Sequence, residues 1–365
     1  MSIPDQERPY YNAFNQLPQI GSVRLRKLLN FFSSMEEAWR ASTSALAAAG
    51  LEQAVINELL GARGQIDPNE EWDRLKVAKI RMLTIRDDDY PKLLLEIPNP
   101  PVVLYLRGIL ARADATAVAV VGSRKMSAYG RQVTEELVAD LVRAGVTVVS
   151  GLALGTDAVA HRTAVEQGGR TIAILACGAD AIYPSSNRQI AERILGGHGA
   201  IISEFPLGTP PLKHHFVYRN RIISGLALGT VVVEAAADSG ALITARHALE
   251  QNRQVFAVPG SIYSPVSAGP NNLIKMGAKP VTAATDILED LNLGHLQQQL
   301  ATTEILPDND EEAALLKILT RQPQHFDLLV KTTGLPTATV AATLTVMEMK
   351  GKARNLGANQ YILSR

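Results

Sequence analysis

The feature that most constrains the fold is a series of six short apolar segments between residues 118 and 258 that lack polar alternation. The predicted strands are Val118–Val121, Val146–Val149, Thr171–Leu175, Ala200–Ser203, Thr230–Val233 and Val255–Val258. The predicted helices between them are Tyr129–Ala144, Asp157–Gln167, Asn187–Leu195, Asn220–Leu226 and Gly240–Gln251. Apolar strands alternating with helices are typical of a parallel sheet that is covered on both faces. The sequence therefore predicts an α/β domain with a Rossmann-like, doubly wound, mainly parallel sheet.

The first two strands of this series each end in a loop of small residues. Gly122-Ser123-Arg124 follows the first strand, and Ser150-Gly151 follows the second. Open parallel sheets bind ligands at the carboxyl ends of their strands, because backbone N–H groups and helix N-termini converge there. Glycines in these loops are also explained by tight turns, but an arginine in such a crevice is costly without a partner. Arg124 therefore indicates an anion-binding site.

The loops do not carry the common nucleotide-binding motifs. Gly122–Ser127 lacks the G-x-G-x-x-G spacing, and the chain has no G-x-x-x-x-G-K-[ST] loop, so P-loop ATP hydrolysis is not expected. The strand ends instead offer a wider set of bare N–H groups and short hydroxyls. These positions are Gly122, Ser123, Ser150, Gly151, Gly155, Gly178, Ser239 and Gly240. Together they predict an anion-lined crevice wider than one pyrophosphate needs.

Composition adds only mild constraints. The 365 residues carry 36 Lys and Arg against 36 Asp and Glu, so no overall field favours nucleic acid. Ala115–Pro280 has a small basic excess, 15 against 11. Cys177 is the only cysteine, which excludes an intrachain disulfide and argues against a thiolate metal cluster. We expect no metal, no cofactor, no membrane span and a cytoplasmic location.

Both flanks of the central domain have their own character. Residues 1–75 read as a small helical domain of the SAM or helix-hairpin-helix type, in which the turn Leu17–Gly21 either contacts phosphate or only packs. A proline-rich lead-in with two short strands then opens the central domain, residues 76–290. A linker at 291–308 precedes a terminal domain at 309–365.

The terminal domain has the pattern of a winged helix. Helices are predicted at Glu311–Thr320, Phe326–Thr332 and Thr337–Lys350, followed by a β-hairpin over 351–363. The helix that would read DNA has no Lys, Arg, Asn or Gln before Lys350, and base reading needs such side chains. We expect a protein contact, or a weak backbone contact through Lys350, Lys352 and Arg354.

A second candidate site is the segment from Pro210 to Arg221. It joins Lys213, Arg219 and Arg221 to two histidines and to the aromatic residues Phe216 and Tyr218. Bases stack on aromatic faces while cations hold phosphates, a combination that suits single-stranded nucleic acid. The alternative is a loop anchored by its aromatic residues, with its arginines paired to Glu204 or Glu234.

Taken in their order along the chain, the sequence motifs resemble those of the DNA-processing protein A (DprA, or Smf) family. The resemblance covers about residues 80–280 strongly and the flanks more loosely. The matching motifs are Gly122-Ser123-Arg124, Tyr129-Gly130, Ser150-Gly151-x-Ala153-x-Gly155-x-Asp157, Ala160-His161, Tyr183-Pro184, Ile202-Ser203-Glu204, Arg219-Asn220-Arg221-Ile222-Ile223-Ser224-Gly225-Leu226, Val231-Val232-Val233-Glu234-Ala235, Ser239-Gly240-x-Leu242-Ile243-Thr244-Ala245 and Val255-Phe256-Ala257-Val258-Pro259-Gly260.

This resemblance implies a non-enzymatic role. Family members bind single-stranded DNA in the Rossmann-like domain, protect incoming strands during natural transformation and load the RecA recombinase, and they form homodimers through the same domain. The resemblance implies nucleic-acid contacts at Gly122, Ser123, Arg124, Ser150, Gly151, Lys213, Phe216, Arg219, Ser239 and Gly240. Pocket or brace positions would be His161, Asn220, Arg221 and Glu234, with a brace favoured for Arg221. Phe216 would stack on a base, and Arg124 and Lys213 would hold phosphates.

The sequence departs from the family pattern before Arg219. Phe216-Val217-Tyr218-Arg219 stands where the family usually shows Phe-Pro-x-Arg, which leaves the shape of this segment open. Asn252 and Thr156 also replace the usual glycine and isoleucine, and both changes look tolerable.

An enzymatic alternative rests on two residues and on the fold. Asp157 and His161 could act as an orienting acid and a base, although Asp157 also suits a helix start, and no serine or cysteine nucleophile accompanies them. The alternative function is a nucleotide-processing, phosphoribohydrolase-like enzyme. That family carries Pro-Gly-Gly-x-Gly-Thr where this chain has Glu234–Gly240, and the missing glycine pair weighs against it.

Overall fold

The computed structural model describes residues 3–299, 307–320 and 322–363. It divides into two compact units, Met1–Gln297 and Gln298–Arg365. The predicted domain limits at 75 and 290 fall inside the first unit and stay predictions. Residues 300–306 of the predicted linker lie outside the described residues. Among the described residues, no helix is both long enough and apolar enough to cross a membrane.

The first unit is built on a nine-stranded sheet with the strand order β1-β2-β6-β5-β4-β3-β7-β8-β9. Neighbouring strands from β6 to β9 are parallel, and β1 and β2 add an antiparallel edge. The predicted Rossmann-like, mainly parallel sheet is therefore confirmed. The strands are β1 Arg81–Thr84, β2 Val103–Gly108, β3 Ala117–Val121, β4 Thr147–Ser150, β5 Thr171–Ile174, β6 Gly199–Ser203, β7 Gly229–Val232, β8 Gln254–Ala257 and β9 Lys279–Pro280.

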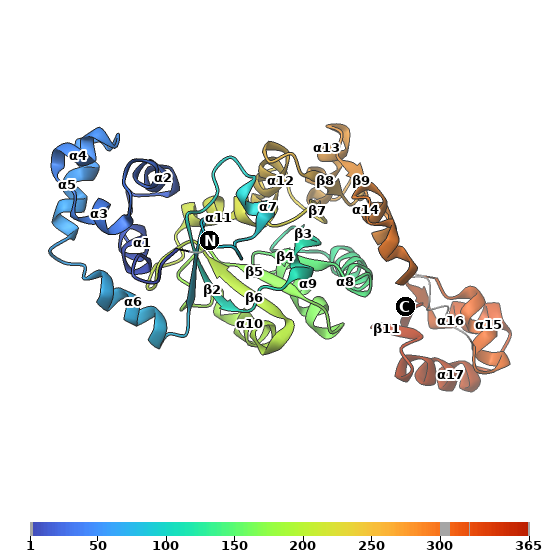
Figure 1. Ribbon diagram of the computed structural model, residues 1–365. Helices are drawn as coiled ribbons and strands as arrows, with labels where there is room; N and C mark the ends of the chain where they lie inside the picture. Colours follow the sequence, from blue (N-terminus) through green and yellow to red (C-terminus); the bar gives the residue numbers. More distant parts are fainter. Residues whose placement is uncertain (1–2, 300–306, 321, 364–365) are drawn as a thin grey trace. The chain divides into compact units, whose positions relative to one another are not determined.

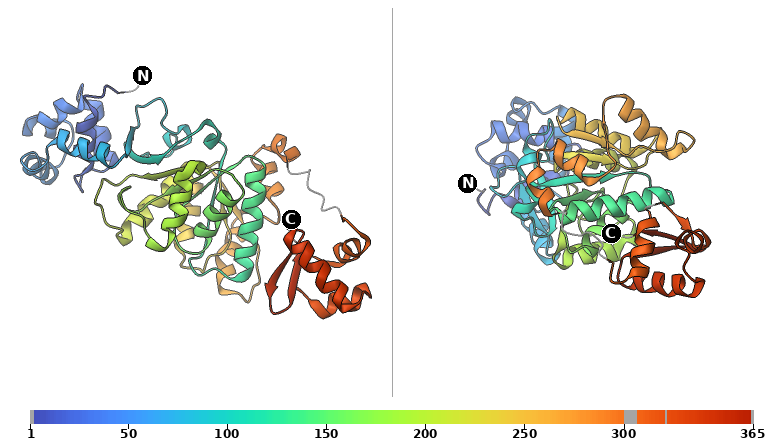
Figure 2. Two further views of the ribbon diagram at one scale, coloured as in Figure 1. Left: turned by 90° about the horizontal axis from the view of Figure 1, so that it is seen from below. Right: turned by 90° about the vertical axis from the view of Figure 1, so that its right-hand side faces the viewer.

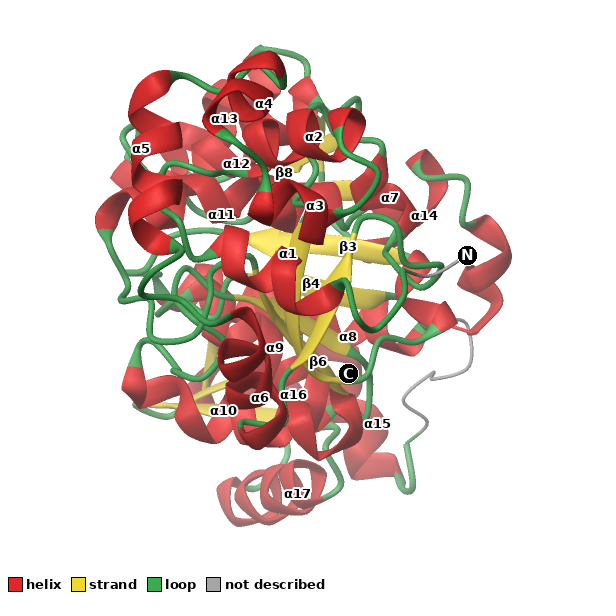
Figure 3. Cartoon of the chain, turned by 60° about the vertical axis from the view of Figure 1, so that its left-hand side comes forward, coloured by secondary structure: helices red, strands yellow, loops and turns green. Residues whose placement is uncertain are grey.

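Helices cover both faces of this sheet, which explains why β3 to β7 are buried along their whole length. Figure 1 shows α11 and α12 on one side and α8, α9 and α10 on the other, and Figure 3 shows the strands between these layers. The helices are α8 Ala128–Arg143, α9 Thr156–Glu166, α10 Arg188–Arg193, α11 Lys213–Gly225, α12 Gly240–Glu250, α13 Ala268–Lys275 and α14 Ala284–Asp290. Short 3₁₀ or π turns are η1 Arg112–Ala115, η2 Ser185–Asn187, η3 Ile194–His198, η4 Pro265–Ser267 and η5 Gly294–Gln299.

Strand β3 is the topological switch point of the sheet. The chain runs from β3 to β4 on one side, and it later returns to place β7 on the other side. The loops that leave β3 and β7 therefore diverge to opposite faces and open a crevice between them. This crevice holds the candidate site.

Helix α11 begins earlier than predicted. The sequence interpretation started this helix at Asn220, but the structure starts it at Lys213. The segment after Pro211 contains no further proline and no glycine before Gly225, so nothing interrupts the helix once the chain leaves Pro210-Pro211. The cluster of cations and aromatic residues is consequently helical, not a loop.

Six helices precede the sheet and share a hydrophobic core with strands β1 and β2. They are α1 Arg8–Asn15, α2 Ser22–Phe31, α3 Met35–Arg40, α4 Thr43–Ala48, α5 Gln53–Ala62 and α6 Pro68–Val77, and the short α7 Lys92–Leu95 follows β1. Phe14 and Trp39 meet edge to face with ring centroids 5.0 Å apart. The side chains of Leu17 and Ile20 in the predicted phosphate-contacting turn are buried. This burial shows that the turn packs, and a phosphate contact there stays a prediction.

The second unit confirms the predicted winged helix, whose helices and hairpin are drawn in orange to red in Figure 2. Its helices are α15 Asp310–Ile318, α16 Phe326–Thr333 and α17 Thr337–Met349. Its strands, in the order β10-β12-β11, are β10 Gln324–His325, β11 Ala353–Gly357 and β12 Gln360–Leu363. Leu315, Leu329 and Leu344 form the centre of its core. Residues 321, 364 and 365 of the predicted domain lie outside the described residues.

Candidate nucleic-acid interface

A groove of about 890 Å³ lies at the carboxyl ends of β3 and β7. Its walls are the loop after β3, the first turns of α11, and the loop and N-terminus of α12. Nine of the residues predicted from the sequence line it, namely Gly122, Ser123, Arg124, Lys213, Phe216, Arg219, Asn220, Ser239 and Gly240. The structure thus brings together three chain segments that are far apart in the sequence.

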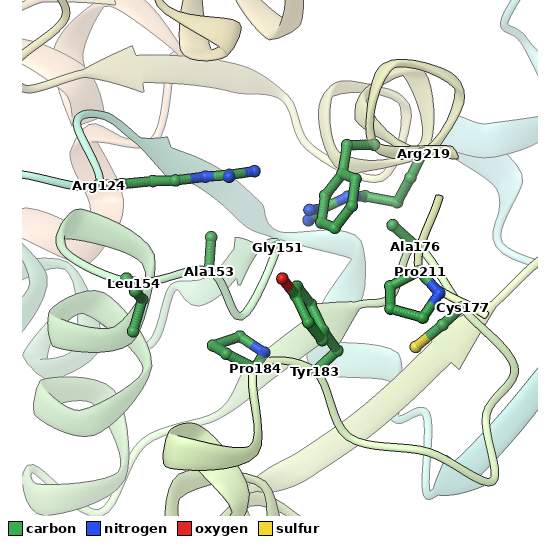
Figure 4. A pocket seen from close by; sticks show the side chains of 11 residues that line it. Arg124, Gly151, Ala153, Leu154, Ala176, Cys177, Tyr183, Pro184, Pro211 and Arg219 are labelled. Atoms are coloured by element: carbon green, nitrogen blue, oxygen red, sulfur yellow. The ribbon is translucent and has the colours of Figure 1, made fainter. Parts of the chain in front are cut away.

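Arg124 and Arg219 face each other across this site. Figure 4 shows their guanidinium groups pointing toward one another from opposite sides, above the hydroxyl of Tyr183. The ring of Phe216 lies against both groups, with its centroid 5.2 Å from Cζ of Arg124 and 5.8 Å from Cζ of Arg219. Within the described residues neither arginine forms an ion pair. Two neighbouring cations without acidic partners favour an anionic ligand.

Arg219 is the more unusual of the two, because it is only 3% exposed. Its Nη1 donates to the carbonyl of Ile174 at 3.0 Å, while its Nε is buried without a partner. Burial lowers the pKa of Arg219 to about 10; Asp157 acts in the opposite direction, and the nearby Arg124 lowers the pKa further. The guanidinium is therefore still protonated at neutral pH, with donors to spare.

Gly151 makes room for Arg219. A Cβ atom at this position would lie 1.4 Å from Nη1 of Arg219, so no larger residue fits beside the guanidinium. The N–H of Gly151 donates to Oδ2 of Asp157 at 3.1 Å. This N–H is therefore already used inside the protein, and a nucleic-acid contact at Gly151, which lines a small pocket beside the groove, stays a prediction.

Ser150 points away from the groove. Its hydroxyl is buried and donates to the carbonyl of Val120 at 2.7 Å, between β4 and β3. The prediction of a nucleic-acid contact at Ser150 is corrected, because this hydroxyl is buried. Side chains alternate along a strand, so the last residue of a strand can face the helix layer instead of the crevice.

Asp157 and His161 are both in the core below the groove. The N–H groups of Gly151 and Ala153 donate to the Asp157 carboxylate, and burial raises the pKa of this group. Nε2 of His161 accepts from the N–H of Leu152 at 3.3 Å, and Nδ1 lies 2.7 Å from the hydroxyl of Thr171. Burial, reinforced by Arg219, lowers the pKa of His161 to about 3. A neutral histidine with both nitrogens engaged cannot act as a base on a molecule in the groove.

The acids that the sequence offered as partners for the arginines have other roles. Glu204 forms a two-pronged ion pair with Arg221, at 2.6 and 2.7 Å. Glu234 accepts from the N–H of Ser127 at 2.8 Å and from its hydroxyl, and so holds the start of α8. Neither carboxylate reaches Arg124 or Arg219, which leaves these two arginines unpaired.

Local hydrogen bonds shape the walls of the groove. The hydroxyl of Ser123 accepts from the N–H of Lys125 at 3.0 Å, which stabilises the turn that presents Arg124. Nδ2 of Asn220 donates to the carbonyl of Gly240 at 3.2 Å and so ties α11 to the start of α12. The Ser239 hydroxyl caps α12 by accepting from the N–H of Ala241. A Cβ atom placed at Gly240 would meet no other atom within 4 Å.

Sequence reasoning missed several residues that line the groove. Lys125 follows Arg124 directly and could have been found from its charge and position. Tyr183, Asp238 and Thr244 also line the groove. Tyr183 comes from the loop between β5 and α10, and only the packing of that loop against α11 brings it to Phe216, with ring centroids 5.8 Å apart.

Family models match both units of the chain. A model of the DNA recombination-mediator protein A matches residues 81–292, and a model of the DprA winged helix domain matches residues 299–359. The Smf protein of Synechocystis is 35% identical, over 96% of this chain and 97% of the relative. The Smf protein of Escherichia coli is 41% identical, over 72% of both chains.

Two solved structures are similar as well. The X-ray structure of DNA processing protein A from Streptococcus pneumoniae matches with a TM-score of 0.68 and 35% identity, covering 80% of this chain and 99% of that one. The protein from Helicobacter pylori, described for its single-stranded DNA binding mode, matches with a TM-score of 0.53 and 28% identity, covering 59% and 97%. The chain therefore belongs to the DNA recombination-mediator protein A (DprA/Smf) family.

Proposed function

We propose that this protein binds single-stranded DNA in the groove at the switch point and acts without catalysis as a recombination mediator. The observation that carries the proposal is the pair of unpaired arginines, Arg124 and Arg219, on either side of the Phe216 ring. Cations next to an aromatic ring that is only partly buried, as Phe216 is, are what a phosphate chain with unstacked bases needs. The Helicobacter pylori relative, whose description names single-stranded DNA binding, supports the same reading.

Each wall of the groove then has its own role. Arg124, Lys125 and Lys213 are exposed and hold successive phosphates. Phe216 offers its ring to a base once Arg124 moves from the ring to a phosphate. Arg221 and Glu204 brace α11 from the other side and do not line the groove.

The test is a salt-titrated binding assay with single-stranded, duplex and mononucleotide ligands. Single strands should bind best, and affinity should fall linearly on a log–log plot against salt. Arg124→Ala should weaken single-strand binding by about tenfold or more, because it removes a charge-assisted hydrogen bond. The matched control is Arg188→Ala, which removes an exposed arginine on α10 that lies outside the groove. Wild-type protein that binds only the mononucleotide would contradict the proposal.

The finer part of the proposal is that the bound strand is passed to RecA during natural transformation. The measurement is the rate at which RecA starts filaments on single strands covered by a single-strand-binding protein, with and without this protein. Acceleration by wild type that is lost in Arg124→Ala supports strand transfer. Acceleration that persists without strand binding would show that RecA is stimulated in another way.

We also propose that the protein forms homodimers through the Rossmann-like unit. Ile262, Tyr263 and Met276 are 83%, 90% and 79% exposed, an unusual exposure for large apolar side chains. They lie in the loop before α13 and at its end, on one segment that a second copy could cover. Sedimentation of wild type against Tyr263→Glu tests this: the variant should be monomeric at concentrations where wild type is dimeric. Equal mass distributions for the two proteins would place the contact elsewhere.

A further inference from the structure

A small pocket of about 50 Å³ adjoins the groove. It shares Arg124, Tyr183, Phe216 and Arg219 with the groove, so a ligand in the groove can reach into it. Its remaining walls include the small or apolar residues Ala176 and Pro184. Lys125 and Lys213, which line the groove, do not line this pocket. The two lysines that suit phosphates are therefore outside the pocket, while the two arginines line it.

The charged hydrogen-bond donors of the pocket are the guanidinium groups of Arg124 and Arg219, which reach in from opposite sides. Apart from the two arginines, no charged and no amide side chain of the described residues lines it. The only hydrogen bond that the Arg219 guanidinium makes within the described residues runs from Nη1 to the carbonyl of Ile174, so Nη2 donates to no group there. Arginine has no acceptor, so the Arg219 guanidinium can only donate. A ligand atom that meets this guanidinium must be an acceptor.

A phosphate group does not fit these walls as well as the edge of a base does. A phosphate needs donors around several oxygens, and most of this surface is apolar. A base has two apolar faces and a polar edge, which matches an aromatic wall at Phe216 and a donor side at Arg219. The volume is too small for a whole nucleotide and suits the edge of one base.

We infer that this pocket reads the keto edge of a base, such as O4 of uracil or thymine or O6 and N7 of guanine, through Nη2 of Arg219. Cytosine and adenine carry an amino group at the corresponding position, and its hydrogens would face donors. The protein therefore prefers keto bases over amino bases in one register of the bound strand. This inference rests on the proposed function, because the strand must first lie in the groove.

The test compares wild-type affinity for short oligo-dU and oligo-dC strands of equal length at several salt concentrations. These two bases are both pyrimidines without a 5-methyl group, and they differ at C4 and in the proton on N3. Oligo-dU should bind about fivefold or more tightly, with an equal salt dependence for both strands. An oligonucleotide of pyrimidin-2-one, which lacks the C4 oxygen, should bind no better than oligo-dC.

Two variants assign the preference to Arg219. Arg219→Lys keeps the charge but loses the forked donors, so its preference for oligo-dU should fall to about one. Lys213→Ala is the matched control, which should weaken both strands equally and keep the preference. Thermal melts establish that each variant is folded. If Arg219→Lys does not fold, the wild-type comparison with pyrimidin-2-one decides the question.

The outcomes separate this inference from the proposed function. Equal, salt-dependent affinity of the wild type for oligo-dU and oligo-dC overturns the keto-edge pocket and leaves single-strand binding intact. A preference that survives in Arg219→Lys overturns the assignment to Arg219. A wild-type protein that binds neither strand overturns the proposed function itself, and the pocket inference with it.

Discussion

At the scale of single residues, the site depends on how one buried cation is accommodated. Arg219 is held by the Ile174 carbonyl and lies in the space that Gly151 leaves, while Asp157 supplies a nearby negative charge. Desolvating an arginine with an orphan Nε is unfavourable, so the fold maintains this geometry at a cost in stability. A ligand that accepts hydrogen bonds from the Arg219 guanidinium would offset this cost in stability.

Substituting Gly151 by alanine tests this view of Arg219. The new Cβ would overlap Nη1, so the guanidinium has to move, and we expect single-strand affinity to fall by about tenfold or more. Overpacking should also lower the free energy of unfolding by about 1–3 kcal/mol. Gly61→Ala on α5 is the control: its Cβ meets nothing within 4 Å, and the change should leave binding unaltered. Unchanged binding by Gly151→Ala would show that the position of Arg219 is unimportant.

His161 predicts a dependence of stability on pH. Its pKa is about 3 in the folded protein against an ordinary value of 6.5, so the unfolded chain takes up a proton first as the pH falls. The contribution of His161 to the free energy of unfolding has its full value above pH 6.5. It decreases as the pH falls, by about 2 kcal/mol between pH 6.5 and pH 5.

The measurement is the free energy of unfolding in urea at pH 7 and pH 5, for wild type and for His161→Gln. The raised pKa of Asp157 acts with the opposite sign, but it is present in both proteins and largely cancels in the difference. The variant should lose less stability than wild type between the two pH values. An identical loss in both proteins would mean that His161 does not titrate in this way.

At the scale of elements, the early start of α11 places the site. Lys213, Phe216, Asn220 and Ile223 recur at spacings of three and four residues, and all four line the groove. Val217 permits this, because an α-helix that starts at Lys213 needs the N–H of Val217 for a bond to the Lys213 carbonyl. The family's usual proline at this position would remove that bond.

Val217→Pro should therefore free the first turn of α11 while the helix continues from residue 217. The expected result is a weaker single-strand affinity and a salt slope reduced by about 0.7, as for the loss of one phosphate contact in Lys213→Ala. Val217→Ala is the control that keeps the N–H and the slope. A proline variant with the wild-type slope would show that Lys213 holds its phosphate without the helix.

At the scale of the whole molecule, two lysines of the winged-helix unit, Lys350 and Lys352, are already engaged in ion pairs. Lys350 and Lys352 both pair with Asp308 and with Glu312, whose side chain is inaccessible to solvent. Hydrogen bonds from Lys350, which has the larger effect, and from Lys352 lower the pKa of the Asp308 carboxyl and of the Glu312 carboxyl to about 2. A DNA phosphate would have to compete with these carboxylates, which weighs against the predicted backbone contact through the two lysines and favours the predicted protein contact.

We therefore expect the first unit to carry the binding of single strands. A fragment of residues 1–297 should bind single strands with an affinity within about twofold of the full chain and with the same salt slope. The fragment 298–365 should show no measurable binding under the same conditions. The assay is fluorescence anisotropy with a labelled single strand, and a tenfold loss in the first fragment would contradict the assignment.

Sequence reasoning succeeded where the controlling interactions are local. Apolar runs such as Val118–Val121 predict buried parallel strands because only strands covered on both faces can be apolar throughout. Gly122-Ser123-Arg124 predicts a binding loop because it ends such a strand. The predicted start of α11 at Asn220 was wrong, because the cations, histidines and aromatic residues of 213–219 show no clear apolar period of a helix.

The sequence by itself thus determined the order of the strands and helices, the crevice at the strand ends and the presence of Arg124 and Phe216 on its walls. Only the tertiary structure decided which polar groups face the crevice. Ser150 and His161 turn into the core, while Tyr183 arrives from the loop after β5 and meets Phe216. Arg219, on the same helix as Phe216, turns into the space that Gly151 leaves. The physical reason is that secondary structure follows from neighbours along the chain. The direction and charge state of a side chain are instead set by desolvation and by hydrogen bonds to residues distant in sequence.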